Sequence, residues 1–185
     1  MEKVLFLRHM DKKKIFVAAL VISTILLSSF TFYFYQVIFT ANFLVEQENR
    51  YLYIPTGSTF EDVQRIVYDE KIVNDPISFG MLSKFMDYDQ LVKPGKYLLE
   101  TNSNNITVIR KLRAGDQVPV RVTFTNARFP EEAAEKITAN IELSPQDFLN
   151  LLLSEESAAS YGFNLESFRC MLIPNTYEVY WNITG

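Results

Sequence analysis

The stretch IFVAALVISTILLSSFTFYFY, residues 15–35, decides how this chain is organised. It contains no charged residue and directly follows three lysines at residues 12–14. As an α-helix that rises about 1.5 Å per residue, the stretch would span about 30 Å, the thickness of the apolar core of a bilayer. A helix also satisfies its own backbone hydrogen bonds in lipid. The sequence therefore predicts a transmembrane helix over residues 15–38.

The charges on either side of this run predict its orientation. Residues 1–14 carry five Lys or Arg residues against two acidic ones, whereas the first charges after the run are Glu46 and Glu48. Lys and Arg are enriched on the cytoplasmic side of membrane helices. We therefore expect a single-pass protein with a cytoplasmic tail over residues 1–14 and the following part of the chain outside the cytoplasm.

Two other interpretations of the run are open. A cleaved signal peptide has an apolar stretch of about 7–15 residues and a small-residue cleavage site, but this run is longer and no A-x-A site lies near its end. A buried helix of a soluble protein is the other alternative. The length and the flanking charges favour a retained anchor.

Composition excludes several kinds of site and partner. The chain has a net charge of −4 and its basic tail carries +3, so residues 15–185 carry −7, which disfavours nucleic acid as a partner. The single histidine, His9, lies in the tail, so a multi-histidine metal site or a His-based triad beyond the anchor is excluded. We expect no metal and no cofactor. The single cysteine, Cys170, precedes apolar residues 171–173 and is expected to be a buried thiol.

Residues 46–115 predict a small module with the order strand, helix, helix, strand. The strands are expected at residues 51–54 and 96–99, paired with both helices on one face. Ser58 and Glu61 have the spacing of a capping box at the start of the first helix.

Further signals place the other helices of this module. Pro76 opens the second helix. Asn105 is expected to cap a third helix, which Gly115 ends. Helical spacing predicts that the second helix has the inner face Ile77, Met81, Leu82 and Phe85.

Residues 117–185 predict the beginning of a second α+β unit. Apolar and polar residues alternate over residues 118–124, as in a half-buried strand. Helices are expected to begin at Pro130 and at Pro145, followed by a buried strand at 171–173, a turn at 174–177 and an extended segment at 178–181. Because Tyr177, Tyr180 and Trp181 have no evident partner, we expect the sequence to be a fragment of a longer chain. The fold class is α+β.

Several segments resemble those of the YceG-like endolytic murein transglycosylases. Residues 173–182, IPNTYEVYWN, are similar to the family's Pro-Asp/Asn-Thr-Tyr segment. Residues 54–59 (IPTGST), 94–97 (PGKY) and 110–115 (RKLRAG) are similar to the opening, turn and closing helix of its LysM-like module. The resemblance covers about residues 15–185. It implies an anchor in the bacterial inner membrane, a LysM-like module over residues 46–115 and the start of a catalytic domain over residues 117–185.

The resemblance also implies an activity. Such enzymes cut nascent peptidoglycan strands between N-acetylmuramic acid and N-acetylglucosamine and leave 1,6-anhydro ends. One glutamic acid protonates the leaving oxygen and then acts as a base, which requires a pKa near the working pH. The implied partners are the glycan strands and the inner membrane, with cell-wall synthases as further candidates.

The resemblance transfers no catalytic residue to this chain. The family's glutamate follows the Pro-Asn-Thr-Tyr segment in an Ala-Ser-Ile-x-Glu-Lys-Glu pattern, and no segment here matches it. Asn175, Thr176 and Tyr177 match the motif and are candidate substrate-binding residues; a local turn is the alternative. Glu178 is either an exposed strand acid or a substrate contact.

Other features leave the function open between two classes. Tyr180 and Trp181 either stack on sugar rings or form an uncovered edge. The chain also departs from the family at residues 169–170 and 126–128, where members have Glu-Gly and Pro-Glu-Gly. The alternative to a transglycosylase is a non-enzymatic peptidoglycan-binding or cell-division adaptor.

Overall fold

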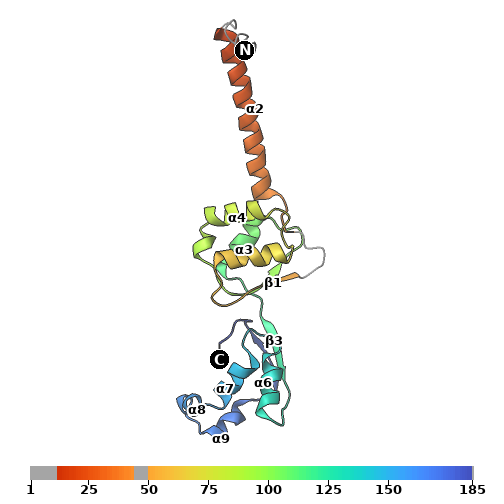
Figure 1. Ribbon diagram of the computed structural model, residues 1–185. Helices are drawn as coiled ribbons and strands as arrows, with labels where there is room; N and C mark the ends of the chain where they lie inside the picture. Colours follow the sequence, from red (N-terminus) through yellow and green to blue (C-terminus); the bar gives the residue numbers. More distant parts are fainter. Residues whose placement is uncertain (1–11, 44–49, 185) are drawn as a thin grey trace. The chain divides into compact units, whose positions relative to one another are not determined.

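The computed structural model describes residues 12–43 and 50–184 (Figure 1). It separates into two units, residues 1–40 and residues 41–185, which are described here one at a time. The described residues form a mixed α+β structure with two small two-stranded sheets, which confirms the expected fold class.

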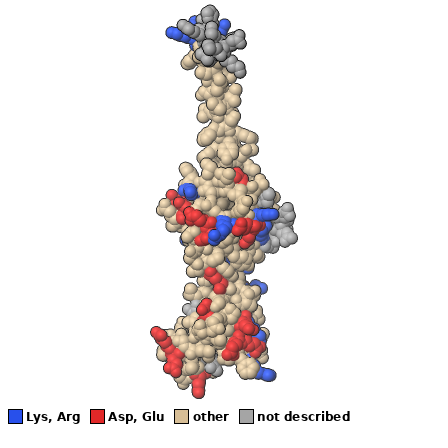
Figure 2. Space-filling model, viewed as in Figure 1, with Lys and Arg blue, Asp and Glu red and all other residues tan. Residues whose placement is uncertain are grey.

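The first unit is the helix α2 (Lys12–Phe39). It ends one residue beyond the expected boundary. Its length and composition are sufficient for crossing a membrane, and Figure 2 shows a surface without charged atoms along most of its length. Residues 1–11 of the expected cytoplasmic tail lie outside the described residues.

The first half of the second unit is the expected strand-helix-helix-strand module, with a 3₁₀ helix before its second strand and a further helix after it. The two strands pair antiparallel from Arg50↔Leu99 to Ile54↔Gly95. Leu52, Ile54, Tyr97 and Leu99 are fully buried on one face of this sheet. The elements are β1 (Arg50–Ile54), α3 (Phe60–Asp69), α4 (Pro76–Phe85), η2 (Tyr88–Gln90), β2 (Gly95–Leu99) and α5 (Asn105–Ala114).

Two buried tyrosines belong to the core of this module. The Tyr97 hydroxyl donates a hydrogen bond to the carbonyl oxygen of Lys93 at 2.9 Å. Burial is the main cause that raises the pKa of Tyr97 to about 12, and it raises the pKa of Tyr88 further. Both rings are therefore neutral core side chains rather than acid–base groups.

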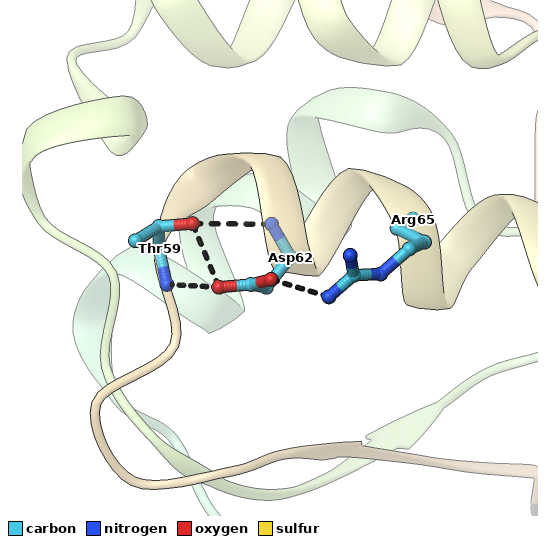
Figure 3. A network of polar contacts seen from close by, with 3 residues as sticks. All are labelled: Thr59, Asp62 and Arg65. Carbon is cyan, nitrogen blue, oxygen red and sulfur yellow. Dashed lines mark hydrogen bonds and ion pairs between the residues drawn. The ribbon is translucent and has the colours of Figure 1, made fainter.

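Helix α3 begins one residue later than the sequence pattern predicted. The cap is Thr59, whose hydroxyl accepts from the Asp62 amide at 3.3 Å, while the Asp62 carboxylate accepts from the Thr59 amide at 2.9 Å (Figure 3). The expected pair, Ser58 and Glu61, is wrong. The sequence holds two overlapping boxes with the same spacing, and the hydroxyl and acid of the second box make the reciprocal bonds.

This capping box makes the start of α3 sensitive to acid. The hydrogen bond from the Thr59 backbone, followed by that from the Thr59 hydroxyl, lowers the pKa of Asp62 from its usual value of 3.8. A lowered folded-state pKa stabilises the fold above the unfolded value, and this contribution is lost as the pH falls through the folded pKa. We expect faster amide exchange at Asp62 in wild type as the pH falls through this range, after correction for intrinsic exchange rates, and a flatter profile in Asp62→Asn. Equal profiles would contradict this prediction.

The face of helix α4 that packs on the core is not the one that its apolar spacing predicted. Ile77, Met81 and Phe85 are 71%, 58% and 79% exposed, so the prediction is wrong for these three residues and correct for Leu82. A Cβ on Gly80 would lie 2.5 Å from the side-chain nitrogen of Gln64 on α3, so this side of α4 packs closely on α3. The residues that α4 buries are Ser78, Phe79, Gly80, Leu82 and Ser83.

The polar side chain of Asn42 fixes this rotation of α4. Its amide nitrogen donates to the carbonyl oxygen of Asp75 at 2.9 Å, to the Ser78 hydroxyl at 3.3 Å and to Asn105 Oδ1 at 2.8 Å. Its Oδ1 accepts from the Asp75 amide at 2.6 Å. Because Asn42 is buried, Ser78 has to face inward to meet it. Asn104, not the expected Asn105, caps α5 by accepting from the Thr107 amide.

The second half of this unit contains the other sheet and a group of short helices. Strands β3 and β4 pair antiparallel from Val120↔Val179 to Phe124↔Asn175. Helix α6 packs on β3 and on α7. The elements are β3 (Val120–Phe124), α6 (Pro130–Thr138), α7 (Pro145–Leu152), α8 (Glu155–Ser160), α9 (Leu165–Phe168), η3 (Arg169–Met171) and β4 (Asn175–Val179).

Three expectations for the C-terminal segment are wrong. Residues 171–173 form the end of η3 and an irregular stretch, not a strand. The strand begins instead at Asn175, inside the expected turn, because residues 175–179 have a complete pairing partner in β3. Cys170 is exposed rather than buried, since η3 does not bring it to the core. Helix α8 was not predicted.

Candidate functional site

The motif residues Asn175, Thr176 and Tyr177 are the first three residues of β4. Successive side chains of a strand point to opposite faces of the sheet, and directly paired residues share a face. Tyr177 pairs with Val122, and Thr176 pairs with Thr123. Thr176 therefore lies on one face, whereas Asn175 and Tyr177 lie on the other.

The face that carries Thr176 is a polar strip. The hydroxyls of Thr123 and Thr176 are 3.0 Å apart, and Arg121 Nε lies 3.1 Å from Glu178 Oε1. The Arg121 and Glu178 side chains are 77% and 58% exposed, so their ion pair contributes at most about 1 kcal/mol to stability. We call Arg121, Thr123, Thr176 and Glu178 the outer strip. Its exposed hydroxyls and charges can bond a polar polymer at little cost to the fold.

The opposite face is apolar and carries Tyr177, whose side chain stays 41% exposed. The Tyr177 hydroxyl donates to the carbonyl oxygen of Ile173 at 2.7 Å, and Asn175 Oδ1 accepts from the amide of Thr176 at 2.8 Å. Both side chains thus make local bonds of the kind that a structural role requires. The ring of Tyr177 borders a cavity of about 290 Å³ whose lining also includes Val122, Phe124, Ile137, Phe148 and Leu172.

A second cavity, of about 430 Å³, joins the two sheets of the unit. Trp181 lies edge-on to Tyr53, with ring centroids 5.2 Å apart. Lys96 Nζ lies 4.1 Å from the centroid of the Tyr51 ring and 5.7 Å from that of Tyr53. We call this the aromatic cavity; it is lined by Tyr53, Lys96, Arg121, Asn140 and Trp181, among others.

Sequence reasoning singled out Trp181 as a candidate for stacking on sugar rings, with an uncovered edge as the alternative, but missed the residues around it. The alternation of β1 was a usable signal, because Leu52 and Ile54 point to the core and so send Tyr51 and Tyr53 outward. Lys96 follows from the register, since it pairs with Tyr53. Arg121 belongs to both the outer strip and the aromatic cavity, so the two surfaces are continuous.

The carboxyl groups with shifted pKa values do not have the character of a general acid. Asp62 and Glu132 both have lowered pKa values, in Glu132 mainly because the side chain of Lys136 donates to it. A general acid at neutral pH needs a raised pKa. Among residues 12–43 and 50–184, no group of three His, Cys, Asp or Glu side chains could hold a metal ion.

Comparisons with known proteins point to one family. The model of the YceG-like family matches residues 52–185. A solved structure of a YceG-like protein from Listeria monocytogenes aligns over 71% of this chain and 48% of that chain, with 22% sequence identity and a TM-score of 0.36. The chain therefore covers about half the length of that protein. A comparison with curated proteins found no match. Since the family match spans well over half of the residues, this chain belongs to the YceG-like family.

Proposed function

We propose that this protein acts on peptidoglycan as a membrane-anchored endolytic transglycosylase. The observation that carries the proposal is the family match over residues 52–185, which includes both the outer strip and the aromatic cavity. The length and apolar surface of α2 support an anchor in the inner membrane. The three lysines at the start of α2, residues 12–14, and the acidic residues Glu46 and Glu48 after it support an extracytoplasmic position for residues 41–185.

In this proposal, residues 41–185 hold the glycan strand. Exposed ring faces such as that of Tyr53 suit the apolar faces of sugar rings. Lys96 and Arg121 suit the carboxylates that N-acetylmuramic acid and its peptides carry, since cations bond carboxylates strongly. The hydroxyls of Thr123 and Thr176 suit sugar hydroxyls. We propose that Thr176 binds substrate directly, whereas Asn175 and Tyr177 hold the strand end in place.

The chemical step needs one acid beyond the groups described. The acid donates its proton to the glycosidic oxygen while the bond from that oxygen to C1 of the muramoyl residue breaks. The 6-hydroxyl oxygen of the same residue forms the new bond to C1, and its proton returns to the carboxylate. No water is consumed. We propose that a segment with the family's Ala-Ser-Ile-x-Glu-Lys-Glu pattern supplies this acid.

The first test of this proposal is cleavage. We expect residues 1–185, reconstituted in liposomes, to leave purified glycan strands uncut, because no segment of this chain matches the family's glutamate pattern. The same chain extended through a helix with the family's glutamate pattern is expected to release 1,6-anhydro ends, measured by mass spectrometry. Cleavage by residues 1–185 would show that the acid lies within this chain. A lack of cleavage by the extended chain would refute the activity.

A second test measures glycan binding at the aromatic cavity. Trp181 is the only tryptophan of the chain, so its fluorescence reports this cavity directly. We expect soluble glycan strands to change this signal and Tyr53→Ala to weaken their binding about three- to tenfold, the range of one aromatic contact. Tyr68→Ala is the control, because Tyr68 is a tyrosine of α3 that is 66% exposed and does not line the cavity. Equal affinities for the two variants would show that the aromatic cavity does not bind the glycan strand.

The alternative function is that of a non-enzymatic adaptor that binds peptidoglycan or joins cell-division proteins. It is favoured by the binding character of the described groups, which include aromatic rings, hydroxyls and cations. It predicts binding to insoluble peptidoglycan by the native protein without any release of 1,6-anhydro ends.

A further inference from the structure

Helix α4 exposes three large apolar side chains in one line. Ile77, Met81 and Phe85 are spaced four residues apart, so they follow one another along the same side of the helix. They are 71%, 58% and 79% exposed. The buried side of the helix holds small residues such as Ser78 and Gly80. We call these three residues the α4 stripe. A contiguous exposed apolar surface of this kind marks an interaction site.

The charges of α4 suit a lipid surface. Its ten residues, PISFGMLSKF, include no acid and one base, Lys84, which is exposed in the last turn beside the stripe. A lysine can lay its stem along an apolar surface while its ammonium group reaches anionic headgroups. Apolar side chains flanked by a base are the pattern of helices that lie in the membrane interface.

The length of chain between α2 and Asn42 limits how far the start of α4 can lie from the end of α2. Asn42 is bonded to Asp75, the residue that caps α4, through both its Oδ1 and its side-chain nitrogen. Asn42 follows Phe39, the last residue of α2, by three positions. Three residues of chain cover about 10 Å at full extension, whatever direction they take. If α2 crosses the bilayer, the start of α4 cannot lie far from its surface.

We propose that the α4 stripe docks on the outer surface of the bilayer that α2 crosses. Ile77, Met81 and Phe85 enter the boundary between headgroups and acyl chains, and Lys84 contacts lipid phosphates. The inference rests on the proposed anchor. Docking would fix the height and tilt of residues 41–115 above the membrane, so that the glycan-binding surfaces face the wall in one orientation.

Site-directed spin labelling tests this inference on the whole chain. Cys170 is exposed and is first replaced by Ser. Single labels are then placed at Ile77→Cys, Met81→Cys or Phe85→Cys in liposomes of phosphatidylethanolamine and phosphatidylglycerol. We expect oxygen, which concentrates in lipid, to relax these labels at least threefold more than a water-soluble nickel complex does. A label at Tyr68→Cys on α3 should show the opposite preference.

Each other outcome has a definite meaning. If the stripe labels behave like Tyr68→Cys while a label at Thr24→Cys in α2 stays in the oxygen-rich phase, docking is refuted and the anchor stands. If Thr24→Cys is also reached by nickel, the anchor itself fails, and the docking inference fails with it. Strong dipolar broadening between Met81→Cys labels of two copies would show that a second copy covers the stripe, which overturns the proposal. A label at Lys84→Cys should become nickel-accessible when Ile77, Met81 and Phe85 are all replaced by Ser.

Discussion

Asn42→Ala is expected to lower the free energy of unfolding of residues 41–115 by about 3 kcal/mol. The Asn42 side chain bonds both the amide and the carbonyl of Asp75, and it also donates to Asn105 Oδ1. Alanine would leave these partners, which are buried or part-buried, without their hydrogen bonds to Asn42. A buried polar group that loses its partner costs about 1–3 kcal/mol.

This loss can be measured by urea unfolding of the full chain in detergent, followed by near-ultraviolet circular dichroism of the buried tyrosines. Hydrogen exchange of α4 and α5 should rise in the same variant, because Asn42 joins the starts of both helices. Asn74→Ala is the matched control, since the Asn74 side chain is exposed and the substitution keeps its backbone bond to Asn42. A change below 1 kcal/mol for Asn42→Ala would mean that water replaces the amide.

Element order could be predicted from the sequence because it depends on local patterns. The short segments at residues 51–54 and 96–99, each next to a break that contains Pro and Gly, and the apolar spacing between them predicted the pairing of β1 and β2 and the helices that cover one face. The exact first residues of the helices were harder to predict. Two overlapping capping boxes begin at Ser58 and at Thr59, and only the geometry of the chain entering α3 distinguishes them.

The rotation of α4 could not be predicted, because its cause is not local. The helix has apolar residues on two sides, Ile77 and Met81 on one and Phe79 and Leu82 on the other. Counting apolar spacing favours the first side, which has the longer series. The side that packs on the core is the one that places Ser78 against Asn42, a partner 36 positions away in the sequence.

Only part of the candidate site could be predicted from the sequence, for the same reason. The motif identified Asn175, Thr176 and Tyr177, but their division between two faces depends on the pairing of β4 with β3, whose residues lie more than 50 positions away. Asn and Thr favour turns locally, so the start of β4 was expected to be a turn. The outer strip follows only once the register is known, because it requires Arg121 opposite Glu178.

Two substitutions in α4 compare the observed rotation of this helix with the one that apolar spacing predicts. Phe79→Ala is expected to cost about 3–5 kcal/mol, since Phe79 is 1% exposed and its ring meets that of Phe43 edge-on at 5.7 Å. Met81→Ala on the same helix should change stability by less than about 1 kcal/mol, because Met81 already faces outward. Urea unfolding in detergent measures both. A larger loss for Met81→Ala than for Phe79→Ala would mean that α4 packs with the α4 stripe inward, and the membrane-docking surface would then not exist.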